Sequence, residues 1–189
     1  TPKVLHRISG LELLGHVLST ATSLSANHVV SVLRHERERL ESYVSAFYPQ
    51  VSVALQDEIP GTGRAVEAAL EQLAGFQGDV AVLSGDVPLL DVESISALVE
   101  IHRELGNQAT LVSTILDNPH GYGRIVRDRG ELLGIVEQKD ATDDQREINE
   151  VNAGVYVFDA ELLRQTLAKV GTNNSQGEKY LTDVIGMLI

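Results

Sequence analysis

The 189-residue sequence contains no cysteine, and this absence excludes several kinds of chemistry at once. Without cysteine there is no disulfide framework, no thiolate nucleophile and no cysteine-based zinc site. This composition suits a reducing compartment, so we expect a cytoplasmic protein. The sequence also has no apolar run of about 18 residues and no basic segment followed by an apolar one. We therefore expect neither a membrane segment nor an export signal.

Basic residues are scarce as well, since 15 Lys and Arg stand against 27 Asp and Glu and give a formal net charge of −12. Nucleic acids and anionic membranes bind proteins through basic surfaces, so neither is an expected partner. An acidic protein that binds a nucleotide must hold the phosphates by local means. These are a cation, a few well-placed Lys or Arg side chains, and backbone N–H groups.

Several familiar motifs are missing. The six histidines form neither a His-x-His nor a His-Glu-x-x-His pattern, which leaves no histidine metal site to propose. There is no Gly-x-Ser-x-Gly elbow, no Walker loop and no Gly-x-Gly-x-x-Gly fingerprint. No internal repeat with a period of about 20 to 50 residues is present, which excludes a solenoid. Most familiar enzyme classes are therefore unsupported.

Short apolar strands alternate with amphipathic helices along the chain. Apolar spacing predicts helices over residues 11–24, 36–48, 66–73 and 92–105, and strands over residues 28–33, 51–56, 80–83 and 108–116. This alternation is typical of βαβ units. We therefore predict an α/β fold of Rossmann-like, doubly wound type with a mostly parallel sheet, and the chain length fits one domain.

The pattern changes after residue 117. A Gly-rich loop, a strand to Val126, a turn over residues 128–130 and a strand over 132–138 predict a small antiparallel β-insertion over the mouth of the sheet. The remaining pattern predicts a strand over residues 148–158, a helix through 163–170, a polar loop over 172–177 and a last helix through 181–188.

Asp86 follows the end of a predicted strand and is a candidate metal ligand. An apolar run ends at Ser84 and Gly85, Asp86 follows, and Pro88 prevents further strand pairing. The run is predicted to be a buried parallel strand. Ligands of open α/β sheets bind beyond the carboxyl ends of the strands, where a lone Asp can hold Mg²⁺ against a substrate phosphate. An Asp before a proline can equally bond its own backbone in a turn.

Two other strand ends carry groups that suit a ligand. Gly61 and Gly63 flank Thr62, so the backbone can approach a ligand, Thr62 can cap the following helix, and free N–H groups favour an anion or a base edge. An ordinary strand-to-helix turn would have the same sequence. The Glu137 carboxylate only accepts hydrogen bonds, whereas the Asn152 amide both donates and accepts them. Together these two groups suit the hydroxyl and N-acetyl groups of a sugar. Solvated strand ends often carry the same residues.

Seven sequence blocks, in order along nearly the whole chain, together resemble one protein family. The blocks are Pro2-Lys3-Val4-Leu5, Leu55-Gln56 with Gly61-Thr62-Gly63, Gly85-Asp86-Val87-Pro88-Leu89, Gly121-Tyr122-Gly123-Arg124-Ile125, Ile135-Val136-Glu137, Glu150-Val151-Asn152-Ala153-Gly154, and Asn173-Asn174-x-Gln176-Gly177-Glu178 with Tyr180-Leu181-Thr182-Asp183. The family is the bifunctional bacterial N-acetylglucosamine-1-phosphate uridyltransferase / glucosamine-1-phosphate acetyltransferase. The resemblance is to its N-terminal uridyltransferase domain alone.

This resemblance implies that UTP and N-acetylglucosamine 1-phosphate react, with Mg²⁺ as cofactor, to give UDP-N-acetylglucosamine and pyrophosphate for peptidoglycan, the cell-wall polymer. It implies that Asp86 binds Mg²⁺ and that Lys3 contacts phosphate, both as catalytic residues. The residues that it assigns to the nucleotide are Lys3, Gln56, Gly61, Thr62, Ser84 and Gly85, and those that it assigns to the sugar are Gly123, Glu137 and Asn152. In-line attack of the sugar phosphate on the α-phosphorus needs no covalent nucleophile, so catalysis is mainly positioning and charge neutralisation.

The resemblance is incomplete at both ends of the chain. The family's Gly-rich loop and first strand would precede Pro2. A second metal-binding Asn and the hexapeptide-repeat acetyltransferase domain, through which the family forms homotrimers, would follow Ile189. We therefore expect residues 1–189 to be a nucleotidyltransferase domain truncated at both ends. Two other functions stay open, namely a pyrophosphorylase for another sugar nucleotide and a non-catalytic module that binds nucleotide sugars.

Overall fold

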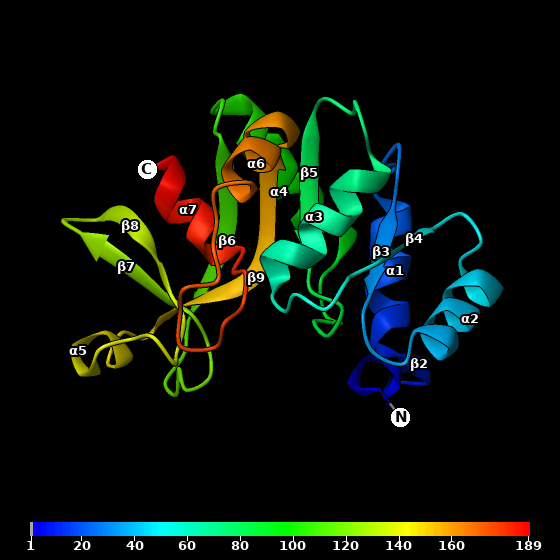
Figure 1. Cartoon of the computed structure of the whole chain (residues 1–189), viewed down its shortest axis with the longest axis horizontal. Coiled ribbons are helices and arrows are strands. Elements are labelled where there is room, and N and C mark those ends of the chain that lie inside the picture. The colour runs from blue at the N-terminus through cyan, green and yellow to red at the C-terminus, as the bar shows by residue number, and fades with distance from the viewer. Residues whose placement is uncertain (1) are drawn as a thin grey trace.

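Strands and helices alternate along most of the chain in the computed structural model, which describes residues 2–189 (Figure 1). In chain order the elements are η1 (Lys3–Leu5), β1 (Arg7–Ile8), β2 (Leu11–Glu12), α1 (Leu13–Ser23), β3 (Val30–Leu33), α2 (Arg37–Phe47), β4 (Ser52–Leu55), α3 (Thr62–Gln72), β5 (Asp79–Leu83), α4 (Val92–Glu104), β6 (Ala109–Ile115), β7 (Arg124–Asp128), β8 (Glu131–Val136), α5 (Asp143–Arg146), β9 (Glu150–Asp159), α6 (Ala160–Leu167) and α7 (Thr182–Leu188). The predicted α/β fold is confirmed. Among residues 2–189, no helix has the length and apolar character needed to cross a bilayer.

The strands form three sets. β1 and β2 make a short antiparallel hairpin, and β3 and β4 make a parallel pair. The third set is a five-stranded sheet in which β9 pairs antiparallel with β5, β6 and β7, and β8 pairs antiparallel with β7. The β7–β8 hairpin projects from one end of the molecule beside α5, as Figure 1 shows. The antiparallel pairing predicted for the insertion is therefore confirmed, and its predicted place over the mouth of the sheet stays a prediction.

Strand direction differs from the sequence prediction at β5. Residues 80–83 do not form the parallel strand predicted for them, because β5 pairs antiparallel with β9 from Asp79 opposite Asp159 to Leu83 opposite Val155. Within residues 2–189, parallel pairing is confined to β3 and β4, so the prediction that the sheet is mostly parallel is wrong. An apolar run reports burial but not the direction of the neighbouring strand, and β9 returns from the insertion with the opposite direction.

Apolar side chains gather in three clusters that hold these layers together. The largest joins α3, α6 and α7 to β9 and the β7–β8 hairpin around Phe158 and Leu163, both 0% exposed. A second packs α1 and α2 on β3 and β4 around Val44, and a third packs α4 on β9 around Ile95. Each such fully buried side chain stabilises the fold by about 1.5–3 kcal/mol.

Three short features were not predicted. They are the single turn η1, the β1–β2 hairpin and α5, and their helices and strands are only two to four residues long. Elements this short leave no periodic signal in a sequence window. Only α5 has a local signature, because Thr142 and Gln145 form a reciprocal capping box at its start.

Candidate active site

Asp86 lies directly after β5, in the turn that leaves the edge of the sheet, and its partner is Lys3. The Lys3 Nζ and Asp86 Oδ2 atoms are 2.6 Å apart, although the residues are 83 positions apart in the chain. The side chains are 74% and 38% exposed, so both are open to a ligand. The hydrogen bond to Asp86 and its negative charge raise the pKa of Lys3. The structure thus brings together the two residues predicted to handle phosphate and metal.

The surroundings of Asp86 fit one kind of metal site. Within residues 2–189, no group of three or more His, Cys, Asp or Glu side chains is arranged to hold a metal ion. Mg²⁺ in phosphate-transfer sites often needs only one or two carboxylates, because it keeps several waters and binds substrate oxygens. A single accessible carboxylate therefore fits an ion that arrives with a nucleotide, and does not fit one held by protein ligands alone.

Ser84 and Gly85 shape the same turn. Ser84 Oγ donates a hydrogen bond of 3.1 Å to the carbonyl of Gly154, in the middle of β9. Gly154 has a φ of +73°, and a Cβ there would lie 2.7 Å from Ser84 Oγ, so only glycine lets β9 pass this closely. Gly85 is less constrained, because a Cβ there would meet only Leu14 and Val4 at 3.7 and 3.9 Å.

The glycines around Thr62 touch the chain's own backbone. Gly61 has a φ of +113°, and a Cβ there would clash with the backbone of Lys179. Gly63 N donates to the Lys179 carbonyl at 2.8 Å, and Lys179 N donates to the Pro60 carbonyl at 2.8 Å. These glycines therefore permit a close backbone contact within the chain, and the predicted approach to a ligand stays a prediction. The partner in this contact is the segment before α7.

The predicted cap at Thr62 is wrong. Thr62 is the first residue of α3, the cap position belongs to Gly61, and no side chain caps this helix. Thr62 Oγ1 instead accepts a hydrogen bond of 3.2 Å from Leu181 N. Gln56 is 6% exposed, and its Nε2 donates to the carbonyls of Ile59 at 2.8 Å and Gly61 at 3.1 Å. Its amide group thereby fixes the shape of the loop assigned to the base.

The three residues assigned to the sugar lie together. Asn152 N donates to the Gly123 carbonyl at 2.9 Å, and a Cβ on Gly123 would lie 3.6 Å from both carboxylate oxygens of Glu137. The Asn152 side chain is held at both ends, since Nδ2 donates to Tyr156 Oη at 2.5 Å and Oδ1 accepts from Gly154 N at 3.1 Å. A Cβ on Gly123 would also lie 3.0 Å from Ile135 Cγ2, so glycine at this position avoids crowding Ile135 beside the Glu137 carboxylate.

The environment of Glu137 is acidic and partly dry. Burial raises the pKa of Glu137, and the charges of Asp183 and Asp140 add to this, while the hydrogen bond from Thr182 opposes it. That bond joins Thr182 Oγ1 to Glu137 Oε1 at 2.9 Å. Tyr180 Oη donates to Asp140 Oδ2 at 3.1 Å. Sequence reasoning gave Thr182 and Tyr180 no role, because their partners lie about 40 residues earlier in the chain.

The loop around Thr62 is separate from the Asp86 turn. Among residues 2–189, no hydrogen bond or ion pair joins Gln56, Gly61 or Thr62 to Lys3 or Asp86. The family resemblance assigns Lys3, Gln56, Gly61 and Thr62 to the nucleotide and Asp86 to Mg²⁺. The structure places Gln56, Gly61 and Thr62 after β4 and Asp86 after β5, two strands that are not hydrogen-bonded neighbours, whereas Lys3 lies in η1.

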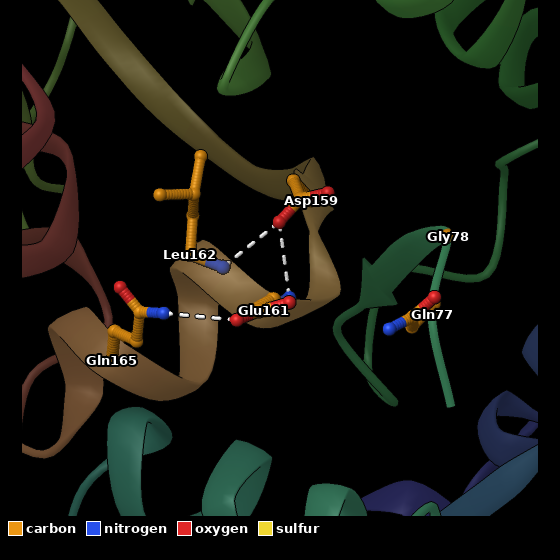
Figure 2. A pocket seen from close by; sticks show the side chains of 6 residues that line it. All are labelled: Gln77, Gly78, Asp159, Glu161, Leu162 and Gln165. Carbon is orange, nitrogen blue, oxygen red and sulfur yellow. Dashed lines mark hydrogen bonds between the residues drawn. The ribbon is translucent and has the colours of Figure 1, made fainter. Parts of the chain in front are cut away.

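Of two hollows in the structure, one lies away from these contacts and the other is lined in part by Thr182. One, of about 420 Å³, is lined by Gln77, Gly78, Asp159, Glu161, Leu162 and Gln165 (Figure 2). Figure 2 shows Asp159 capping α6, with Oδ1 accepting from Glu161 N at 3.0 Å and Leu162 N at 2.8 Å. Gln77 and Gly78 precede β5 while Asp86 follows it, so this hollow is at the other end of the strand. The second, of about 360 Å³, lies between β8 and α7.

Comparison with known proteins identifies the family of the chain. Residues 1–189 match the nucleotidyl transferase family. The chain is 56% identical over 189 residues to "Bifunctional protein GlmU" of Clavibacter sepedonicus, covering 99% of this chain and 38% of that protein. It is 52% identical over 190 residues to the protein of the same name from Leifsonia xyli subsp. xyli, covering 100% of this chain and 39% of that protein. The chain thus spans less than half the length of these relatives.

Solved structures share the fold at low sequence identity. A UDP-glucose pyrophosphorylase complexed with UDP-glucose superposes with a TM-score of 0.72 at 16% identity, covering 98% of this chain and 78% of that one. A putative glucose-1-phosphate thymidylyltransferase from Bacillus anthracis gives 0.77 at 19% identity, with coverages of 97% and 72%. The predicted Rossmann-like fold class is confirmed, and the chain belongs to the nucleotidyl transferase family.

Proposed function

We propose that this chain joins UTP and N-acetylglucosamine 1-phosphate, releasing pyrophosphate and giving UDP-N-acetylglucosamine for cell-wall synthesis. Membership of the nucleotidyl transferase family supports the reaction class. The sequence blocks quoted above support the two substrates, and the relatives named GlmU agree with them. A cytoplasmic location and a larger bifunctional, trimeric protein belong to the same proposal.

The observation that carries this proposal is the contact between Ser84 and Gly154. Their 3.1 Å hydrogen bond ties the turn that bears Asp86 to the strand that bears Asn152. Each of these two residues is only two positions from the contact. This contact brings the proposed phosphate-handling and sugar-handling ends close together, as attack of the sugar phosphate oxygen on the α-phosphorus of UTP, with release of pyrophosphate, requires.

The phosphate end works by charge. Asp86 would hold Mg²⁺, which when bound supplies neutralisation of the phosphate charges. Lys3 lies 2.6 Å from the same carboxylate, on a flexible and exposed side chain, so its ammonium group can turn from Asp86 to a phosphate oxygen. The proposed base site is the loop shaped by Gln56, with Gly61 and Thr62 at its end.

The sugar end works by hydrogen bonding. The Glu137 carboxylate is an acceptor for sugar hydroxyl groups, and Gly123 places no side chain against it. Asn152 is held by Tyr156 and Gly154, so its orientation is fixed before a ligand arrives. Pre-organised polar groups of this kind bind a ligand without the cost of ordering them.

A substrate panel tests the proposal in the natural full-length protein. Pyrophosphate release is measured with Mg²⁺ and UTP plus either N-acetylglucosamine 1-phosphate or glucose 1-phosphate, and again with dTTP in place of UTP. We expect kcat/KM to be at least about tenfold higher for UTP with N-acetylglucosamine 1-phosphate, a difference of about 1.4 kcal/mol. A higher value for another pair would favour a different pyrophosphorylase. Binding of nucleotide sugar without any release would favour a non-catalytic module.

A further inference from the structure

Residues 179–182, here called the linking segment, touch the loop assigned to the base. Lys179 exchanges two backbone hydrogen bonds of 2.8 Å with this loop, from its N–H to Pro60 and from Gly63 to its carbonyl. Leu181 N donates to Thr62 Oγ1 at 3.2 Å. Three hydrogen bonds thus hold the linking segment directly against the start of α3.

The same segment touches the pocket assigned to the sugar. Thr182 Oγ1 donates to Glu137 Oε1 at 2.9 Å, and Tyr180 Oη donates to Asp140 Oδ2 at 3.1 Å. Lys179 and Leu181 contact the base loop, whereas Tyr180 and Thr182 contact Asp140 and Glu137, so the two sets of contacts alternate along the segment. A shift of this short segment must therefore change both the base loop and the position of the Glu137 carboxylate.

An ion pair fixes the linking segment from the side. Lys179 Nζ lies 2.5 Å from Glu67 Oε1, and the two side chains are only 12% and 20% exposed. Arg64 contacts the other oxygen of Glu67 at 3.2 Å and continues to Asp57 at 2.9 Å and to Glu71 at 3.0 Å. Dissolved salt screens a partly buried ion pair less than it screens an ion pair that is exposed to water. This network anchors Lys179 both to α3 and to the residue that follows Gln56.

We propose that Lys179 is a positioning residue that couples nucleotide binding to sugar-phosphate binding. Its ion pair with Glu67 holds the linking segment, so a nucleotide that orders the base loop also orders Thr182 and the Glu137 carboxylate. The sugar phosphate then binds without bearing the ordering cost a second time, which gives positive cooperativity. This inference rests on the proposed function and adds to it a route by which one substrate prepares the site of the other.

The test compares binding of each ligand alone and of both together, by calorimetry in Mg²⁺ buffer on the natural full-length protein. The nucleotide is UTP with a methylene group in place of the α,β-bridging oxygen, which cannot release pyrophosphate. The coupling factor is the Kd of N-acetylglucosamine 1-phosphate without this nucleotide divided by its Kd with the nucleotide at saturation. Lys179→Met removes the charge and keeps the side-chain length. Lys169→Met is the matched control, because Lys169 is exposed and has no ion pair among residues 2–189.

We expect a coupling factor of about five or more in the wild type and in Lys169→Met. Lys179→Met should lower the factor below about two, while the Kd of the nucleotide alone changes less than about threefold. Lys179→Arg, which keeps the charge, should restore most of the coupling. If Lys179→Met does not fold, Glu67→Gln decides by the same criterion, since it removes the opposite charge and leaves an acceptor oxygen.

An unchanged coupling factor in Lys179→Met, or a wild-type factor close to one, would overturn the inference. A wild type that binds both ligands without coupling would overturn this inference alone. A wild type that binds neither ligand would overturn the proposed function as well, so the two failures are distinguishable.

Discussion

Two glutamates show how the surroundings of a residue decide its chemistry. Burial raises the pKa of Glu137, which lies in an acidic environment. The Arg127 guanidinium, bonded to Glu150 at 2.8 Å through both Nε and Nη2, lowers the pKa of Glu150 to about 2. Glu137 therefore carries a charge at a cost to stability, whereas the charge of Glu150 is stabilising.

The two glutamates should have opposite effects on stability as pH changes. Between its unfolded and its raised folded pKa, Glu137 binds more protons in the folded state. The contribution of Glu137 to the free energy of unfolding is thus present at low pH and is lost as pH rises through the folded pKa. Glu150 contributes stability above its unfolded pKa, and loses it as pH falls toward the folded pKa of about 2.

Urea unfolding at several pH values tests these two opposite effects on stability. At about pH 7.5, Glu137→Gln should raise the urea midpoint above that of the wild type, and the gain should shrink toward about pH 4. Glu150→Gln is the control and should lose about 1 kcal/mol at neutral pH, with a smaller loss near pH 3. A Glu137→Gln protein that is less stable than the wild type at neutral pH would contradict the assigned environment.

At the same scale, Asp86 should matter for turnover and little for stability. Asp86→Asn keeps the side-chain shape but removes the charge that would hold Mg²⁺, so we expect the kcat of pyrophosphate release to fall by much more than about tenfold. The pair with Lys3 is exposed, so unfolding free energy should change by at most about 1 kcal/mol. Turnover within about tenfold of the wild type, a barrier change of only about 1.4 kcal/mol, would rule out the metal role.

At the scale of elements, the base loop and the linking segment form one packed unit, and Gly61 is its closest point. A side chain there would meet the backbone of Lys179, and the φ of +113° is one that other residues rarely adopt. We expect Gly61→Ala to cost about 2 kcal/mol or more of unfolding free energy.

Gly106→Ala separates the two causes of that loss. Gly106 also has a positive φ, +61°, but a Cβ there would have nothing within 4 Å. Its substitution should cost only about 1 kcal/mol, because it carries the backbone strain without the steric conflict. Equal losses for the two substitutions in urea unfolding would show that Lys179 does not pack on Gly61 as described.

At the scale of the whole molecule, the sequence predicts elements well and pairings poorly. The helix expected over residues 36–48 is α2, Arg37–Phe47, because its apolar spacing is purely local. The direction of β5 was missed, since an apolar run is the same beside a parallel or an antiparallel neighbour. The partner of Thr62 was missed for a similar reason, because Leu181 lies 119 positions away.

For the candidate site too, the sequence predicts residues but not their contacts. Local chemistry and family resemblance together named Asp86, Glu137 and Asn152. They could not show that Lys3 pairs with Asp86 or that Thr182 pairs with Glu137, because tertiary packing sets both contacts. Sequence reasoning therefore predicts which groups are present, and the structure shows which of them face one another.

The central claim is that the site has a phosphate end at Asp86 and a sugar end at Glu137. The steady-state kinetics of Glu137→Ala in the natural full-length protein test this division most directly. Removing a charged acceptor from a partly buried pocket costs roughly 1.5–3 kcal/mol. We predict that the KM for N-acetylglucosamine 1-phosphate rises by about ten- to a hundredfold while the KM for UTP stays within about threefold. A raised KM for UTP with an unchanged KM for the sugar phosphate would contradict the account, because the β-insertion would then cover the nucleotide.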